Sequence, residues 1–89
     1  MPHHPESPLS FPCQYPIKVL GYWADDFDAL VLQIVRRHVP NLGEGAVRSR
    51  VSRGGRYVSV TVTIEARSRN QLDAIYRDLT GERRVVMTL

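Results

Sequence analysis

Residues 57–66, with the sequence YVSVTVTIEA, constrain the fold more than any other segment. Every second residue from Val58 to Ile64 is aliphatic, and the residues between them are polar. Successive side chains of a β-strand point to opposite faces of the sheet, so this alternation gives the strand one apolar face. We therefore predict a long strand in a sheet that is covered on one side only.

Two segments have the apolar spacing of amphipathic helices and would supply the covering layer. In residues 25–38 the apolar positions are Phe27, Leu30, Val31, Ile34 and Val35. In residues 69–80 they are Leu72, Ile75, Tyr76 and Leu79. Each set lies on one face of a helix, so we predict two helices that pack on the same side of the sheet.

The ends of both helices carry the expected signals. Asp25, Asp26 and Asp28 are expected to cap the first helix, and His38 is expected to interact with the dipole at its C-terminus before Pro40 ends it. Ser68 and Gln71 have the spacing of a capping box at the second helix. Gly81 stands at the position of a C-cap.

Three further strands are predicted on either side of these elements. Residues 15–22 (YPIKVLGY) would place Ile17, Val19 and Gly21 inward and Lys18, Leu20 and Tyr22 outward. Residues 47–52 form a second strand, joined to 57–66 by a hairpin at 53–56 (RGGR), where glycine supplies a positive φ. The final segment, RVVMTL, is predicted as a short strand with Val85, Met87 and Leu89 on one face.

The element order strand–helix–strand–strand–helix–strand predicts an α+β fold. With right-handed crossovers it is the ferredoxin-like βαββαβ sandwich, an antiparallel sheet of order 4-1-3-2 with two helices on one face. The expected core is Phe27, Leu30, Ile34, Val58, Val60, Val62, Ile64, Leu72, Ile75 and Leu79. Residues 1–12 contain four of the six prolines and are predicted as a disordered arm, followed by one domain at 13–89.

The chain resembles the YbeD-like family of small bacterial proteins of unknown function. The resemblance rests on FPCQYPIKVLG, on RHVP after the first helix, on YVSVTVTIEA, on QLDAIYRDL and on RVVMTL, and it covers residues 11–89. It implies a ferredoxin-like fold similar to the ACT regulatory domain, with ligand sensing or protein association as its role. It implies no catalytic residue.

The residues themselves offer no catalytic constellation, and we expect a protein that is not an enzyme. Cys13 has no histidine close in sequence, and the aspartates at 25, 26 and 28 fit helix capping. His3 and His4 have no further ligand nearby, and no Cys/His spacing matches a zinc site. No glycine-rich phosphate loop occurs either. We therefore expect no metal and no cofactor.

A single cysteine and the absence of a signal peptide or membrane-length apolar run favour a cytoplasmic protein without membrane association. The charge is uneven, because nine of the twelve basic residues lie in 47–89. All nine are arginine, which favours planar contacts to carboxylate or phosphate.

The open face of the predicted sheet is the main candidate for function. Leu20, Tyr22, Tyr57 and Val86 would lie on it together with Lys18, Arg48, Arg50, Thr61 and Thr63. Apolar and aromatic groups rimmed by arginine are typical of a protein interface, so we expect a partner protein or self-association, either at this face or by pairing of an edge strand of the sheet. The alternative is that these side chains only pack across neighbouring strands.

A second candidate is the loop Gly21-Tyr22-Trp23-Ala24-Asp25, which corresponds to the ligand or dimer site of ACT-like domains. Gly21 would allow close approach, and the aspartates would favour a cationic or amino-bearing small molecule. Trp23 is expected to pack as a lid over the start of the helix rather than to hold a ligand.

RNA binding is the alternative function, because the RNA-recognition motif has the same strand order. Arg53, Gly54 and Val58 match its third-strand signature and Tyr57 stands at an aromatic position, whereas Gly55, Arg56 and Val60 do not match. Lys18 stands where a stacking aromatic is wanted. Nucleic acid would bind through Arg48, Arg50, Arg53, Arg56 and Tyr57.

Overall fold

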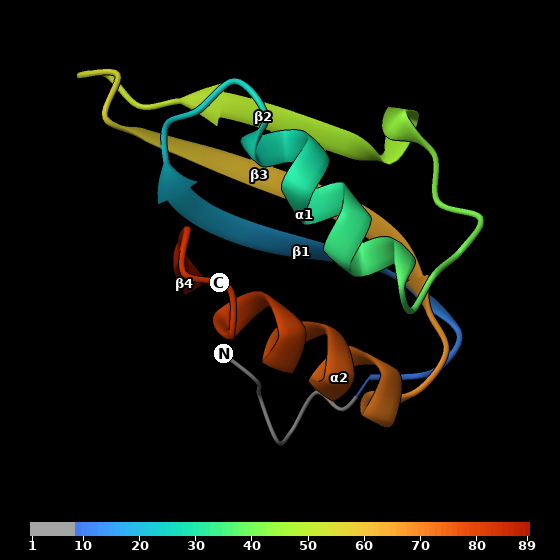
Figure 1. Cartoon of the computed structure of the whole chain (residues 1–89). Coiled ribbons are helices and arrows are strands. Elements are labelled where there is room, and N and C mark those ends of the chain that lie inside the picture. Colours follow the sequence, from blue (N-terminus) through green and yellow to red (C-terminus); the bar gives the residue numbers. More distant parts are fainter. Residues whose placement is uncertain (1–8) are drawn as a thin grey trace.

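The computed structural model describes residues 9–89 as a four-stranded antiparallel sheet with two helices on one face (Figure 1). The elements are β1 (Cys13–Tyr22), α1 (Phe27–Arg36), a 3₁₀ turn (Glu44–Ala46), β2 (Val47–Val51), β3 (Tyr57–Ala66), α2 (Arg69–Thr80) and β4 (Val85–Thr88). The strand order is β2-β3-β1-β4. This is the predicted ferredoxin-like α+β sandwich with the predicted order.

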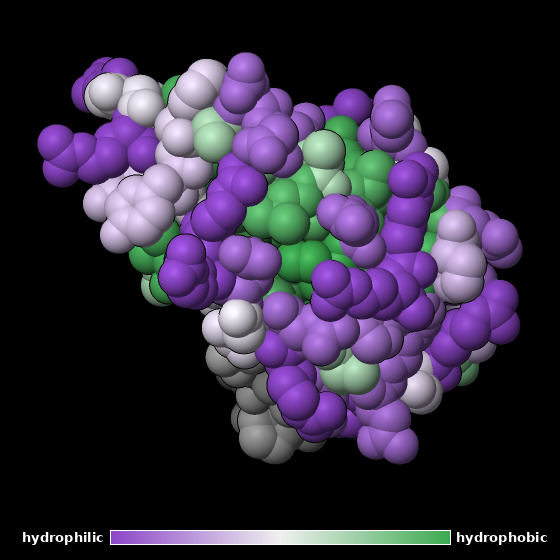
Figure 2. Space-filling view, viewed as in Figure 1, coloured by the Kyte–Doolittle hydropathy of each residue, from purple (hydrophilic) through white to green (hydrophobic). Residues whose placement is uncertain are grey.

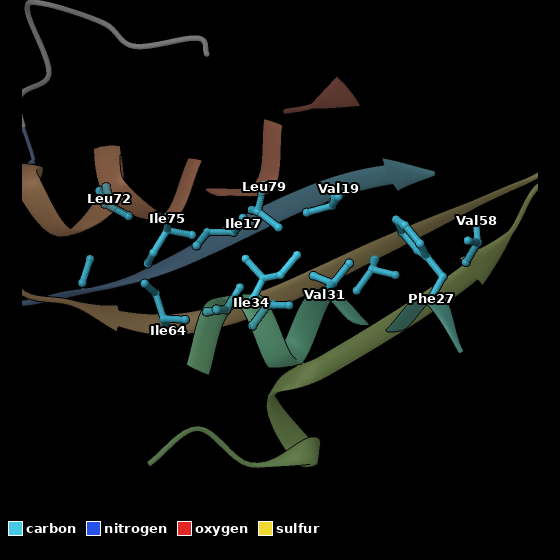
Figure 3. Close-up of a cluster of buried hydrophobic side chains, with 14 residues drawn as sticks. Ile17, Val19, Phe27, Val31, Ile34, Val58, Ile64, Leu72, Ile75 and Leu79 are labelled. Atoms are coloured by element: carbon cyan, nitrogen blue, oxygen red, sulfur yellow. The ribbon is translucent and has the colours of Figure 1, made fainter. Parts of the chain in front are cut away.

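The core lies between the inner face of the sheet and the two helices (Figure 3). β3 contributes Val58, Val60, Val62 and Ile64, all buried, which confirms the register predicted from their alternation. All the predicted core residues are buried except Leu30, which is only partly buried. Leu32 is buried instead, on the flank of α1 that faces β2.

The beginning of the chain is only partly described. Residues 1–8 lie outside the described residues, so the prediction of a disordered arm, and the histidines within it, stay untested there. Leu9 and Phe11 pack against the core. Both residues belong to the predicted arm of 1–12, and the boundary between this arm and the domain stays a prediction.

The two helices begin differently. Ser68 caps α2 as predicted, because its Oγ accepts a hydrogen bond from the Gln71 amide at 3.1 Å. Asp26 is the N-cap residue of α1, but its side chain makes no capping bond. Its carboxylate pairs with Arg84, at 2.6 Å from one guanidinium nitrogen. The prediction that the aspartates cap α1 is thus wrong for Asp26, because a charged partner outside the helix takes its oxygens.

His38 also has a different role from the predicted one. Its Nε2 lies 2.7 Å from Oδ2 of Asp78, which belongs to α2. The side-chain amide of Gln71 donates through Nε2 to the His38 carbonyl at 3.3 Å. His38 therefore joins the end of α1 to α2, and it does not serve only as a charge at the end of its own helix.

The register of β4 differs from the prediction. Gly21 pairs with Val85, but Leu20 pairs with Met87, so one extra residue of β4 stands between these two pairs. Directly paired residues share a face of the sheet, and Leu20 alternates with the buried Val19. Met87 is therefore on the open face, whereas Val85 packs against the core. The prediction of one common face is wrong because the register shift changes the phase within the strand.

Candidate functional site

The face of the sheet that the helices leave uncovered can be described row by row from the strand register. Tyr22 of β1 lies beside Tyr57 of β3. The next row on this face runs from Arg50 through Ser59 and Leu20 to Met87. A third row contains Arg48, Thr61 and Lys18, and the Leu89 amide donates to the Lys18 carbonyl at 2.9 Å. The face thus changes from basic at β2 to apolar at β4.

Tyr22 and Tyr57 form a stacked aromatic pair at one end of this face. Their ring centroids are 5.6 Å apart and the rings are inclined by 29°. Such offset pairs are favourable beyond the area they bury. Tyr22 is still 58 % exposed, while Tyr57 is partly buried. Tyr22 is therefore the tyrosine that faces solvent, and the ring of Tyr57 packs against it.

Aliphatic side chains continue the apolar surface beside these tyrosines. Met87 is 46 % exposed and lies across from the partly buried Leu20. Val86 and Leu89 are exposed on the same short strand and just after it. We define the open-face patch as Leu20, Tyr22, Tyr57, Val86, Met87 and Leu89. The sequence prediction missed Met87 and Leu89, because no residue in RVVMTL signals the register shift.

Two arginines lie at the other side of the open face. Arg48 pairs with Thr61 and Arg50 with Ser59, so both guanidinium groups belong to this face, as predicted. Within residues 9–89 neither makes an ion pair. Arg53 and Arg56 lie in the β2–β3 hairpin, where Gly55 adopts the predicted positive φ of 74°.

The loop after β1 gives less room for a ligand than its glycine suggests. Gly21 is buried, and a Cβ atom placed on it would overlap with the Phe27 ring and lie 2.8 Å from the Arg84 carbonyl oxygen. The close approach that Gly21 permits is therefore made by the protein itself. A small-molecule site at this loop stays a prediction.

Trp23 follows Tyr22 in this loop. Its amide donates to the Arg56 carbonyl at 2.8 Å, which continues the β1–β3 pairing beyond the strand. The indole is 46 % exposed. A lid is solvated on its outer side, so this exposed fraction agrees with a lid as well as with a ligand platform, and the prediction that Trp23 packs over the helix start stays a prediction.

The two carboxyl groups with altered pKa values do not belong to the open-face patch, whereas the hydroxyl of Tyr76 donates to the carbonyl of Leu89 in that patch at 3.4 Å. A hydrogen bond from Arg84 lowers the pKa of Asp26, and one from His38 lowers the pKa of Asp78. Burial, followed by the hydrogen bond with Tyr15, raises the pKa of Tyr76. Each of these groups connects elements of the sandwich. Among the described residues no cluster of three His, Cys, Asp or Glu side chains could hold a metal ion.

None of the helices in residues 9–89 has the length and apolar character needed to cross a bilayer. Cys13, the only cysteine, is partly buried at the start of β1.

Comparison with known proteins gives relatives along most of the chain. Residues 6–89 match the family model described as "Protein of unknown function (DUF493)". A UPF0250 protein of Chromobacterium violaceum is 46 % identical over 81 residues, which are 91 % of either chain. One from Azotobacter vinelandii is 45 % identical over 82 residues, covering 91 % of this chain and 89 % of the relative.

A solved structure supports the fold. The solution structure of protein HP0495 from H. pylori superposes with a TM-score of 0.71, at 17 % identity. The alignment covers 100 % of this chain and 94 % of that one. At this identity the similarity establishes the common fold alone.

Proposed function

The chain belongs to the DUF493 family, the YbeD-like family that its sequence resembles, and from this premise we propose that it is a non-catalytic regulatory or adaptor module. It binds a partner protein through the open-face patch. The observation that carries the proposal is that the exposed side chains of Tyr22 and Met87 lie with the partly buried Tyr57 and Leu20 on a sheet face without a covering layer.

The composition of the patch supports a protein as the partner. Tyrosine and methionine are enriched in protein interfaces, and arginine is common there as well. Tyr22 resembles an anchor residue, because it is exposed while its ring is held by Tyr57. Arg48 and Arg50 would form the polar rim on one side.

A structural role for the titratable groups agrees with this proposal. Asp26 pairs with Arg84 and Asp78 with His38, so the carboxylates with lowered pKa values hold helices in place. Their positions at helix ends, away from the patch, support binding rather than chemistry as the role of the protein.

The test compares single variants in affinity capture followed by amide exchange. Met87→Glu places a charge in the patch at an exposed side chain, so the fold should persist. Asn70→Glu on α2 adds the same charge at an exposed position of the helical layer. We expect the partner to protect the amides of β1 and β4, and Met87→Glu, but not Asn70→Glu, to abolish its capture.

Other outcomes would contradict the proposal. Equal capture by the Met87→Glu variant would show that the patch is not the binding surface. Retention of RNA on a filter at low salt, lost in the Arg50→Ala variant, would favour the nucleic-acid alternative instead. Sedimentation analysis distinguishes a second copy of the chain from another protein, since only self-association increases the mass of the purified protein with concentration.

A further inference from the structure

The outer edge of β2 has unpaired backbone groups at known positions. β2 is the first strand of the sheet, so only one of its sides pairs, with β3. The Ser52 amide donates to the Tyr57 carbonyl at 2.8 Å, directly beyond the Val51–Val58 pair. Because the direction of these bonds alternates along an antiparallel pair, the N–H and C=O groups of Ser49 and Val51 point away from β3. They are free to pair with another strand.

A groove runs beside this edge on the helical side of the sheet. It has a volume of about 490 Å³ between α1 and β2. Its apolar walls are formed by Ala29, Leu32 and Val47. The polar residues that line it are Asp28, Gln33, Arg36, Glu44 and Ser49. Figure 2, which views this side, shows a hydrophobic area over α1 within a hydrophilic surround. The helices do not extend over all of β2, and Val51 is 50 % exposed although its partner Val58 is buried.

The charged side chains of β2 determine which kind of strand can pair with its outer edge. Arg48 and Arg50 point to the open face, and the inner positions between and after them are Ser49 and Val51. A second β2 paired antiparallel to the first would bring arginines opposite arginines, which is destabilising. A strand with carboxylates on its open-face side would instead place them opposite these arginines. The edge is therefore protected against its own copy and complementary to an acidic segment.

From these observations we propose that the β2 edge binds an extended acidic segment of a partner protein as a fifth strand. Carboxylates of the segment face Arg48 and Arg50, and its alternate, apolar side chains lie at the groove along α1. Backbone bonds to Ser49 and Val51 hold the segment in place, which is the mode known as β-strand addition. This inference goes beyond the binding at the open-face patch, because it concerns the opposite edge of the sheet and has only Arg48 and Arg50 in common with the proposed interface.

The test uses a synthetic peptide of about nine residues, the length of a long strand, with alternating glutamate and valine. Its counterpart has lysine in place of every glutamate. We expect binding of the glutamate peptide alone, with slower exchange of the Ser49 and Val51 amides on binding. Arg50→Glu should weaken the affinity by at least about tenfold, as expected for reversal of a close charge pair.

Two further variants separate pairing from charge attraction. Ser49→Pro removes an outward N–H but no bond to β3, and edge strands tolerate proline at such positions. It should weaken binding by about tenfold or more, because a backbone bond to the peptide is lost. Lys18→Glu changes the charge equally on the same face, but in a strand away from the edge, and should alter the affinity by less than about threefold.

The proposal is overturned if the glutamate peptide does not bind the wild-type protein. It is also overturned if Lys18→Glu weakens binding as much as Arg50→Glu while Ser49→Pro has no effect, since that result indicates unspecific attraction. Met87→Glu should leave peptide binding unchanged. A failure of the open-face patch as a binding surface would therefore be recognised separately.

Discussion

At the scale of single residues, Gly21 is the glycine with the least room for a side chain. The Phe27 ring and the Arg84 carbonyl oxygen occupy the space that a side chain would need, and Arg84 also lies 5.8 Å from the centre of the Phe27 ring. The sequence indicated that Gly21 allows a close approach. It could not indicate which group approaches, because Phe27 and Arg84 come from elements that meet only in the folded chain.

Gly21→Ala should therefore destabilise the protein by about 1–3 kcal/mol, the usual cost of overpacking a filled site. The Cβ atom would have to displace backbone as well as the ring. Gly54→Ala is the matched control, because a Cβ atom there would meet nothing within 4 Å. Urea unfolding of both variants measures the difference. Equal stability of the two variants would contradict the packing described for Gly21.

Asp78 gives a prediction for acidic pH. The hydrogen bond from His38 lowers the pKa of Asp78 below 3.8 in the folded protein. The ionised carboxylate therefore stabilises the fold above the pKa of the unfolded chain, and this contribution is lost as the pH falls through the folded value. In urea unfolding from neutral pH downward, Asp78→Asn should be less stable than the wild type near neutrality. The difference should shrink below pH 3.8.

The control for this acid titration is Asp78→Asn introduced into the His38→Ala variant, where the partner of the carboxylate is already absent. In that background the pH-dependent difference caused by Asp78→Asn should be clearly smaller than in the wild type. If Asp78→Asn lowered the unfolding free energy by the same amount at every pH, the interaction between Asp78 and His38 would have no electrostatic contribution.

At the scale of elements, the start of α2 was predictable and the start of α1 was not. Ser68 and Gln71 interact locally, so their spacing alone determines the cap. The Gln71 side chain accepts from the Arg67 amide at 2.7 Å, which completes the local arrangement. Asp26 has the same capping ability as Ser68, but its carboxylate pairs with Arg84, which is remote in sequence.

Ser68→Ala should lower the unfolding free energy by about 1 kcal/mol, because the Gln71 amide loses its acceptor. Ser68→Asp keeps an acceptor oxygen at the cap and should restore most of that loss. Thermal unfolding of the two variants gives the comparison. If alanine and aspartate were equally destabilising, the side chain of Ser68 would have another role than capping.

The strands show the same contrast between local and remote causes. β3 follows its alternation from Tyr57 to Ala66 without interruption, so the sequence determines which side chains face the core. β4 is short, and its pairing with β1 shifts by one residue between Gly21 and Leu20. That shift decides that Met87 belongs to the open-face patch. The four residues of β4 contain no pattern that indicates this shift.

At the scale of the whole molecule, the apolar stripes of two helices and one sheet face were enough to predict the sandwich and its strand order. The width of the helical layer relative to the sheet was not predictable, because it depends on where α1 lies over the strands. α1 leaves the inner face of β2 partly bare, and the groove beside β2 results from this position.

Two paired valines allow a test of how unequally α1 covers β2 and β3. Val51 and Val58 are direct partners on the inner face, but Val51 is 50 % exposed and Val58 only 5 %. Val58→Ala should cost about 2 kcal/mol, from lost burial and the cavity left behind, and Val51→Ala less than about 0.5 kcal/mol. Urea unfolding measures both. Similar costs would indicate that α1 covers β2 as fully as β3.

The two edges of the sheet have a consequence for the protein at high concentration. Growth into a fibre requires that one edge of each molecule fit an edge of the next, so that the ladder continues without end. The β2 edge bears Arg48 and Arg50, and the short β4 contains a register shift that disrupts a regular ladder. Neither edge is a template for the other. We therefore expect the four-stranded sheet to resist growth by edge pairing, and the β2 arginines that would face the proposed acidic segment contribute to this resistance.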